Sequence, residues 1–272
     1  MKTVFEDQTS AVCGASKRMH VNNKWFRILD GSRADIDEAL KRIPETEHVI
    51  FRPSVFRQAC DGLCLDPSIS IESMAFVCRW ALADNEDDDY RGVGLSSLFK
   101  YQQPLGELIG KTLLMRHDSD SVTRTLYIAN DYSPAVAWVL ANRVSSGKSG
   151  PCDSDVVAAI LGEGCPTGGP EVPQTKPFKF SGIDEEAVVL AMSAAFYGEK
   201  QADRETGLRA LEKYPEARLI ALTELAYYDP DAFKKLEIAS PYVAWIVANH
   251  AVHWGHPTIK AVAEEILARH SF

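Results

Sequence analysis

Three histidines near the end of the chain have a spacing that could hold a metal ion. His250 and His253 are three residues apart, so a helix would place both on one face, and His256 follows shortly after. Zinc is commonly bound by imidazole groups, and such a site would make the protein a metal-dependent hydrolase. The segment lacks a partner carboxylate and the glutamate that zinc proteases carry between two histidines. A helix C-terminus also favours groups that can carry positive charge, which is the alternative interpretation.

A second cluster places five carboxylates in the six positions from Asp84 to Asp89. So many like charges cannot be buried together, and the run must therefore be solvated. The glycine and the distal glutamate of a calcium-binding loop are not at the required positions. Either this is a charged loop after a helix, or it docks on a basic partner and speeds the encounter. The candidate partner-binding residues of the sequence are Asp84, Glu86, Asp87, Asp88, Asp89, His250, His253 and His256.

The sequence contains no other motif that predicts catalysis. Gly147-Lys148-Ser149 ends like a phosphate-binding loop, but Asn142 stands where the first glycine is required, and the segment follows a predicted helix instead of a strand. The G-x-S-x-G elbow of serine hydrolases is missing, and six irregularly spaced cysteines define no nucleophile. Cys78 lies in an apolar helical pattern, where we expect a reduced, packed thiol. The sequence therefore assigns no catalytic residue, no metal ligand and no cofactor.

The elements that would position these groups are shown by an internal repeat. Residues 133–142 recur at 240–249 with seven identities in ten positions, and each copy opens with Ser-Pro. Serine is a preferred helix N-cap and proline suits the first helical position, so each copy predicts the start of a helix. If the connection is allowed to differ in length, residues 121–129 align with 231–239. The repeated unit is then a helix, a turn and a second helix, with Trp138 and Trp245 in equivalent buried positions.

Paired short helices of this kind resemble HEAT-like repeats in general architecture, and the resemblance implies an architecture alone. Apolar residues at helical spacing predict further helices at 36–43, 71–82, 155–161, 188–196 and 259–267. Residues 19–28 and 48–51 have the composition of short strands. The predicted fold class is mainly α, with stacked helix pairs (an α-α repeat) and a small β element near the N-terminus.

Glycine and proline residues concentrate between the two copies of the repeat, around 164–170. This composition is typical of a linker or of a long ordered excursion. We expect a first lobe over 1–150 that starts with mixed structure and becomes helical, a connection over 151–182, and a helical lobe over 183–272. One continuous helical body remains the alternative.

Composition narrows the class of protein. The 272 residues are 46% hydrophobic and 25% charged, which is typical of a globular chain. The longest apolar runs are far shorter than the roughly 20 residues that span a bilayer, and the N-terminus lacks the apolar core of a signal peptide. We therefore expect a soluble, cytoplasmic protein. The net charge of -9 disfavours a protein that coats nucleic acid and suits a partner with a basic surface.

These observations together favour a non-enzymatic protein-binding module that occupies or displaces a partner surface. An inhibitor, an immunity protein or an anti-defence protein would act in this way, and nucleic-acid-handling machinery is a target that the acidic segment would suit. One alternative is a metal-dependent hydrolase that uses His250, His253 and His256. Another is a helical repeat protein that binds nucleic acid through a basic concave face.

Overall fold

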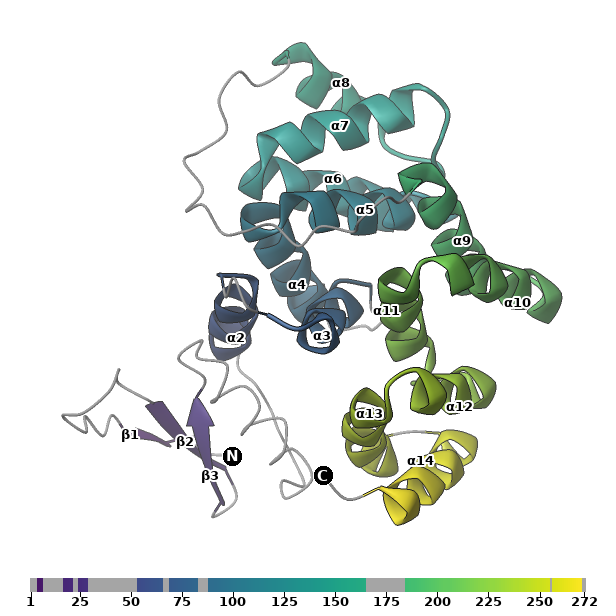
Figure 1. Ribbon diagram of the computed structural model, residues 1–272. Coiled ribbons are helices and arrows are strands. Elements are labelled where there is room, and N and C mark those ends of the chain that lie inside the picture. Colours follow the sequence, from purple (N-terminus) through teal and green to yellow (C-terminus); the bar gives the residue numbers. More distant parts are fainter. Residues whose placement is uncertain are drawn as a thin grey trace. The chain divides into compact units, whose positions relative to one another are not determined.

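The computed structural model describes residues 4–6, 17–21, 24–28, 53–65, 69–82, 88–164, 184–254 and 256–270. Figure 1 labels the described helices and strands. The chain divides into two compact units, Met1–Phe76 with Leu222–Phe272, and Val77–Ala221. The lobe boundaries expected from the glycines and prolines stay a prediction, because most of the expected connection, 165–183, lies outside the described residues.

A three-stranded antiparallel sheet lies near the N-terminus, as the sequence predicts. Its strands are β1 (Val4–Glu6), β2 (Lys17–Val21) and β3 (Lys24–Ile28), in the order β1-β2-β3. Met19 pairs with Phe5 on one side and with Phe26 on the other, which fixes the register. The strand expected at 48–51 and the helix expected at 36–43 lie outside the described residues.

Helices make up the remaining described elements, and the predicted mainly α fold is confirmed. They are α2 (Pro53–Leu65), α3 (Ile71–Leu82), α4 (Asp88–Tyr101), α5 (Gln103–Leu113), α6 (Ser119–Tyr132), α7 (Pro134–Ser145), α8 (Ser154–Gly162), α9 (Glu185–Tyr197), α10 (Gln201–Ala210), the short 3-10 helix η2 (Leu211–Lys213), α11 (Pro215–Leu225), α12 (Pro230–Ala239), α13 (Pro241–Trp254) and α14 (Pro257–Arg269). The helices predicted at 71–82, 155–161, 188–196 and 259–267 correspond to α3, α8, α9 and α14.

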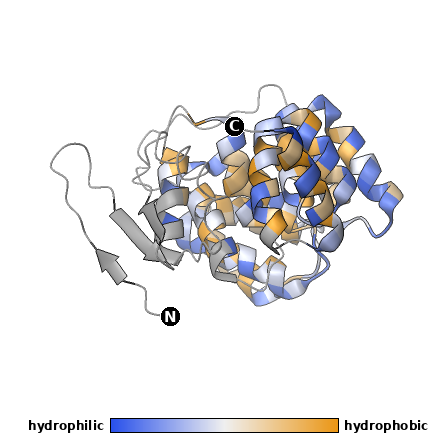
Figure 2. Cartoon of the chain, turned by 90° about the horizontal axis from the view of Figure 1, so that it is seen from below, coloured by the Kyte–Doolittle hydropathy of each residue, from blue (hydrophilic) through white to orange (hydrophobic). Residues whose placement is uncertain are grey.

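The helices contact one another in the manner of stacked pairs. In Val77–Ala221, α4 contacts α5 and α6, α5 contacts α7, and α6 contacts α7 and α8. In the other unit, α12 contacts α13 and α14. Many of the helices carry hydrophobic residues on one side and hydrophilic residues on the other (Figure 2). Each helix can therefore bury its apolar side against both the next helix and the one after it.

The predicted repeat has the same local chemistry in both copies. The Ser133 hydroxyl accepts a hydrogen bond from the backbone N–H of Val136 at the start of α7, and Ser240 does the same for Val243 at the start of α13. At the end of the alignment, the side-chain amide of Asn142 donates to the carbonyl of Trp138, one turn earlier in the helix, at 2.8 Å. The equivalent amide of Asn249 donates to the carbonyl of Trp245 at 2.9 Å.

The register expected for the first helix of the repeat is wrong. Burial matches α6 to α12 when residues are counted back from the shared serine without a gap, so that buried Leu126 corresponds to buried Phe233. The two helices have 14 and 10 residues, and Asp118 and Asp229 form their N-caps. The difference of four residues is close to one helical turn, so an added turn lengthens α6 while its buried side stays in line.

The duplication extends beyond the pair that the sequence reveals. Five identities align α11 with α5 and its C-cap: Pro104 with Pro215, Leu108 with Leu219, Ile109 with Ile220, Thr112 with Thr223, and Leu114 with Leu225. The buried residues Val156 and Ile160 of α8 recur as Val262 and Ile266 of α14. Helix α8, which contacts the pair α6 and α7, therefore has a counterpart in α14, which contacts the pair α12 and α13.

Two glycines at contacts between helices indicate that the first helices of each copy, α3 and α4 in one and α9 and α10 in the other, are also repeated. A Cβ added to Gly94 of α4 would lie 2.8 Å from the backbone nitrogen of Ala81 in α3. A Cβ added to Gly207 of α10 would lie 2.5 Å from the backbone nitrogen of Ala195 in α9. Both glycines precede a buried leucine and allow two helices to approach closely. We infer that α9–α14 repeat α3–α8.

The two repeated tryptophans differ in burial. Trp245 is 8% exposed, whereas Trp138 is only half-buried, so the expectation of two equally buried indoles is wrong for Trp138. The reason lies in their helices. Residues 243–249 of α13 are all buried, while α7 buries one side of the helix and leaves the other accessible.

Candidate interaction surfaces

The acidic run of the sequence is only partly visible in the structure. Asp84, Glu86 and Asp87 lie outside the described residues. Asp88 and Asp89 are the first two residues of α4, where negative charge is favourable because backbone N–H groups point toward that end of a helix. The side chains of these two residues are also outside the described part, so docking by this run stays a prediction.

The three histidines occupy different local settings. His250 on α13 is partly buried, with its ring edge-on to that of Tyr227 at 5.5 Å between centroids. His256 is exposed at the N-cap of α14, where Nδ1 lies 3.1 Å from the hydroxyl of Thr258. His253 lies on α13, and its side chain is not described. Over the described ranges, no three histidine, cysteine or carboxylate side chains come together in a way that could hold a metal ion.

Three of the four described cysteines, Cys60, Cys64 and Cys78, are buried thiols, and Cys152 is partly exposed. Burial raises the pKa of Cys60 and of Cys78 well above the ordinary range, which keeps both protonated and makes them poor nucleophiles. The expectation for Cys78 is confirmed, and Cys60, Cys64, Cys78 and Cys152 form no disulfide.

The segment that ends like a phosphate-binding loop instead terminates α7. Gly147 has φ of 74°, a conformation that favours glycine, and the N–H of Lys148 donates to the carbonyl of Arg143 at 3.1 Å. These are the features of a helix C-terminus, where reversed backbone bonds satisfy the last carbonyl groups. The segment therefore follows a helix and not a strand, as the sequence predicts.

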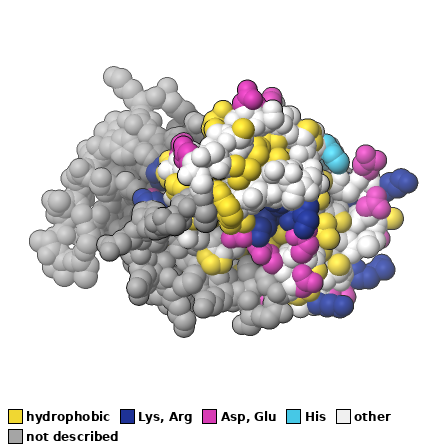
Figure 3. All heavy atoms as spheres, turned by 90° about the horizontal axis from the view of Figure 1, so that it is seen from above, with side chains coloured by type: hydrophobic (Ala, Val, Ile, Leu, Met, Phe, Trp, Pro, Cys, Tyr) yellow, Lys and Arg dark blue, Asp and Glu magenta, His cyan; other side chains and the backbone are white. Residues whose placement is uncertain are grey.

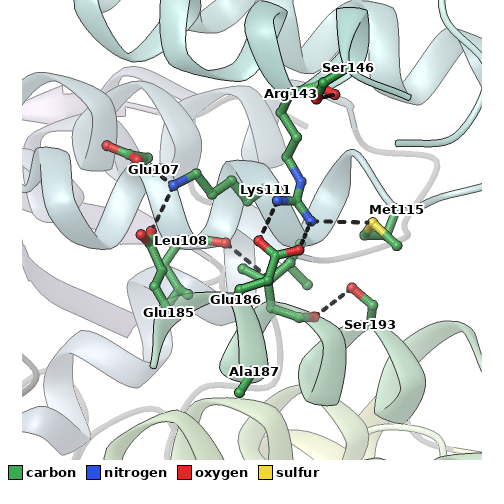
Figure 4. A network of polar contacts seen from close by, with 12 residues as sticks. Glu107, Leu108, Lys111, Met115, Arg143, Ser146, Glu185, Glu186, Ala187 and Ser193 are labelled. Atoms are coloured by element: carbon green, nitrogen blue, oxygen red, sulfur yellow. Dashed lines mark hydrogen bonds and ion pairs between the residues drawn. The ribbon is translucent and has the colours of Figure 1, made fainter. Parts of the chain in front are cut away.

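A network of charges joins α9 to α5 and α7 in the unit Val77–Ala221 (Figure 4). The guanidinium of Arg143 donates to both carboxylate oxygens of Glu186, at 2.6 and 3.0 Å. Lys111 forms ion pairs with Glu107 on its own helix and with Glu185 of α9 at 3.1 Å. The sequence reasoning did not find this network, although the pair Glu185-Glu186 at the start of a helix is a visible signal.

The network shifts the pKa of two of its members. A hydrogen bond from Arg143 lowers the pKa of Glu186, against a smaller opposing effect of burial. Burial by itself lowers the pKa of Lys111, but the hydrogen bonds and charges of Glu107 and Glu185 outweigh it, so the pKa is raised. Both shifts favour the charged forms, and the network therefore acts as a structural tie between helices.

An open groove of about 390 Å³ lies between α6 and α8. Its apolar part is formed by Tyr127, Val156, Ala159 and Ile160, and its polar part by Asn130, Asp153, Asp155 and Glu163. The Tyr127 side chain is 55% exposed, which is unusual for a large ring. The described residues that line the groove include three carboxylates and no lysine or arginine. We call this feature the α6–α8 groove.

The equivalent place in the second copy is bridged by ion pairs. The buried residues align α6 with α12, and in this alignment Asn130 corresponds to Glu237. They also align α8 with α14, so that Glu163 corresponds to Arg269. Arg269 donates to Glu237 at 2.9 Å, and Nε2 of His270 lies 2.8 Å from the other carboxylate oxygen of Glu237. Cationic side chains of α14 and its C-terminal end thus contact α12, whereas α8 of the first copy presents carboxylates.

No family model, no curated protein and no solved structure matches this chain. No helix among the described residues is both long enough and apolar enough to cross a membrane.

Proposed function

We propose that this protein is a non-enzymatic binding module that acts by occupying or displacing a surface of another protein. An inhibitor, an immunity protein or an anti-defence protein would work in this way. The observation that carries the proposal is the duplicated stack of helices together with large apolar side chains left at its surface. Stacked helix pairs build extended surfaces that hold macromolecules.

The exposed apolar side chains are few and large. Ile238 on α12 is 85% exposed, and Tyr228 in the turn between α11 and α12 and Leu190 on α9 are also exposed. On the face drawn in Figure 3, hydrophobic side chains reach the surface beside aspartates and glutamates. Aromatic and aliphatic anchors surrounded by charge are typical of residues that bind a protein partner. Together with the net charge of -9, they favour a partner with a basic surface.

Affinity capture from the native host tests this function. The full chain is used as bait, bound proteins are identified by mass spectrometry, and metal content is measured on the same sample. We expect a stoichiometric protein partner that rebinds when both proteins are purified, with no equimolar zinc. Retained zinc that is lost in the variant His250→Ala/His253→Ala, without a protein partner, would contradict the proposal and support a hydrolase.

The acidic run is tested with the same purified partner. Replacing Asp84, Glu86, Asp87, Asp88 and Asp89 by Asn or Gln should slow association and flatten its salt dependence, because peripheral charges act mainly on the encounter rate. Association kinetics at low and high salt measure the effect. An unchanged association rate at low salt would show that this run does not take part.

A further inference from the structure

The α6–α8 groove combines features that suit one kind of side chain. Asp155 on α8 and Glu163 directly after it place two carboxylates about 12 Å apart along the helix axis, and Ala159 lies between them on the same side. Across from them, Tyr127 of α6 exposes its ring. A guanidinium group is planar and can lie on an aromatic ring while it pairs with carboxylates, and its aliphatic stem suits an apolar floor.

Hydrogen bonds within the chain hold the walls of the groove. The hydroxyl of Thr123 on α6 accepts a hydrogen bond from the backbone N–H of Asp153 at 3.1 Å and lies 3.5 Å from the Cys152 sulfur. The Asp153 carboxylate caps α8 by accepting from the N–H of Asp155 at 2.9 Å. These bonds fix the start of α8 against α6, so a ligand would find the walls already in place and would not have to order them.

The second copy of the repeat shows which group such a place accepts. There, the guanidinium of Arg269 extends from α14 to Glu237 on α12. The corresponding residue of the first copy is Glu163, directly after α8, which has the opposite charge. The first copy thus has a carboxylate at the position where the second copy supplies its own arginine, and a cation that pairs with it would come from outside the described lining.

We propose that the α6–α8 groove binds an arginine side chain of a protein partner, with Tyr127 as its aromatic wall and Glu163 as its paired carboxylate. This assignment rests on the proposed function and names the chemistry of the partner. A volume of about 390 Å³ is within the range of pockets that hold small ligand groups. The carboxylates of the groove do not come together as a metal site in the described part of the chain.

A titration with N-acetyl-arginine N-methylamide tests the proposal on the full chain. Methyl signals of Val156, Ala159 and Ile160 report binding at the groove by NMR. We expect saturable shifts with this probe and at least about tenfold weaker binding of the citrulline analogue, which has nearly the same shape but no charge. Free arginine should bind no more tightly than the capped probe. Tighter binding of free arginine would overturn the assignment to a protein side chain and indicate a small-molecule site.

Matched variants separate the groove from net charge. Asp155→Asn/Glu163→Gln should weaken binding of the capped arginine about fivefold, because one exposed ion pair contributes up to about 1 kcal/mol. Glu199→Gln/Glu212→Gln removes the same charge from exposed positions outside the groove and should change affinity less than about twofold. Equal weakening by both variants, or equal binding of arginine and citrulline, would overturn the proposal.

The occupant is tested separately from the function. With the captured partner, the groove variant should weaken binding while the control variant should not. A partner that binds both variants equally leaves the proposed function standing and overturns the groove assignment. Removing the charges of Lys176 and Lys179 should leave affinity for the capped arginine unchanged. Clearly tighter binding in Lys176→Gln/Lys179→Gln would instead assign the groove to the chain's own 165–183 segment.

Discussion

Replacing Glu186 by alanine should destabilise the unit Val77–Ala221 measurably. The side chain of Arg143 is 6% exposed and that of Glu186 is 48% exposed. Without the carboxylate, two donors of a buried guanidinium lose their acceptor, and hydrogen bonds to charged groups contribute about 1.5–3 kcal/mol. Because water reaches the exposed part of the carboxylate, we expect a value near the lower end, about 1.5 kcal/mol.

Thermal unfolding followed by circular dichroism measures this loss, with Glu185→Ala as the matched control. For a chain of this size, about 1.5 kcal/mol corresponds to a melting temperature lower by roughly 3–6 °C. Glu185 lies in the same first turn of α9, but its partner Lys111 keeps the ion pair with Glu107. The control should therefore lose about 0.5 kcal/mol or less. Equal losses in the two variants would refute the reasoning.

The pH dependence gives a second check on the same pair. The hydrogen bond from Arg143 lowers the pKa of Glu186 below its ordinary value of 4.5 in the folded state. Its stabilising effect is therefore fully present above the unfolded value and is lost as the pH falls through the lowered folded value. The difference in melting temperature between wild type and Glu186→Gln should be constant near neutral pH and shrink below about pH 4.5. A difference that persists unchanged at about pH 2 would contradict the assignment.

Two further changes test the packing. Trp245→Ala should cost about 3–5 kcal/mol, and Trp138→Ala should cost less, because part of its side chain is accessible. Urea denaturation measures both losses, and equal losses would contradict the difference in burial. Gly150→Ala should cost about 1–3 kcal/mol, because the added methyl group would lie 1.7 Å from a backbone carbonyl oxygen. As the control, a methyl group added in Gly162→Ala would have no atom within 4 Å, so this variant should be neutral or stabilised by up to about 1 kcal/mol. Equal stability of the two glycine variants would show that the turn at Gly150 is not tightly packed.

The sequence by itself determined those features that depend on neighbouring residues. Ser133 and Ser240 specify the starts of α7 and α13 because an N-cap bonds to a backbone group three residues away. The stripes of apolar residues in α3 and α14 are likewise local, since helical periodicity alone places them on one side. This is why the fold class and much of the helix pair could be predicted without a structure.

Only the tertiary structure decided which helices meet. Arg143 and Glu186 are 43 residues apart, and Glu237 and Arg269 are 32 apart, so no local rule brings either pair together. The added turn of α6 is also hidden in the sequence, because a helix can gain four residues and keep its buried side in line.

The α6–α8 groove was missed for the same reason. Tyr127 is one aromatic residue among many until α8 is fixed against α6 by a hydrogen bond to Thr123. One signal was present in the sequence, namely the reversal of charge between Glu163 and Arg269. That signal could be seen only after burial had fixed which residues of the two copies correspond, because burial depends on contacts between segments distant in the chain.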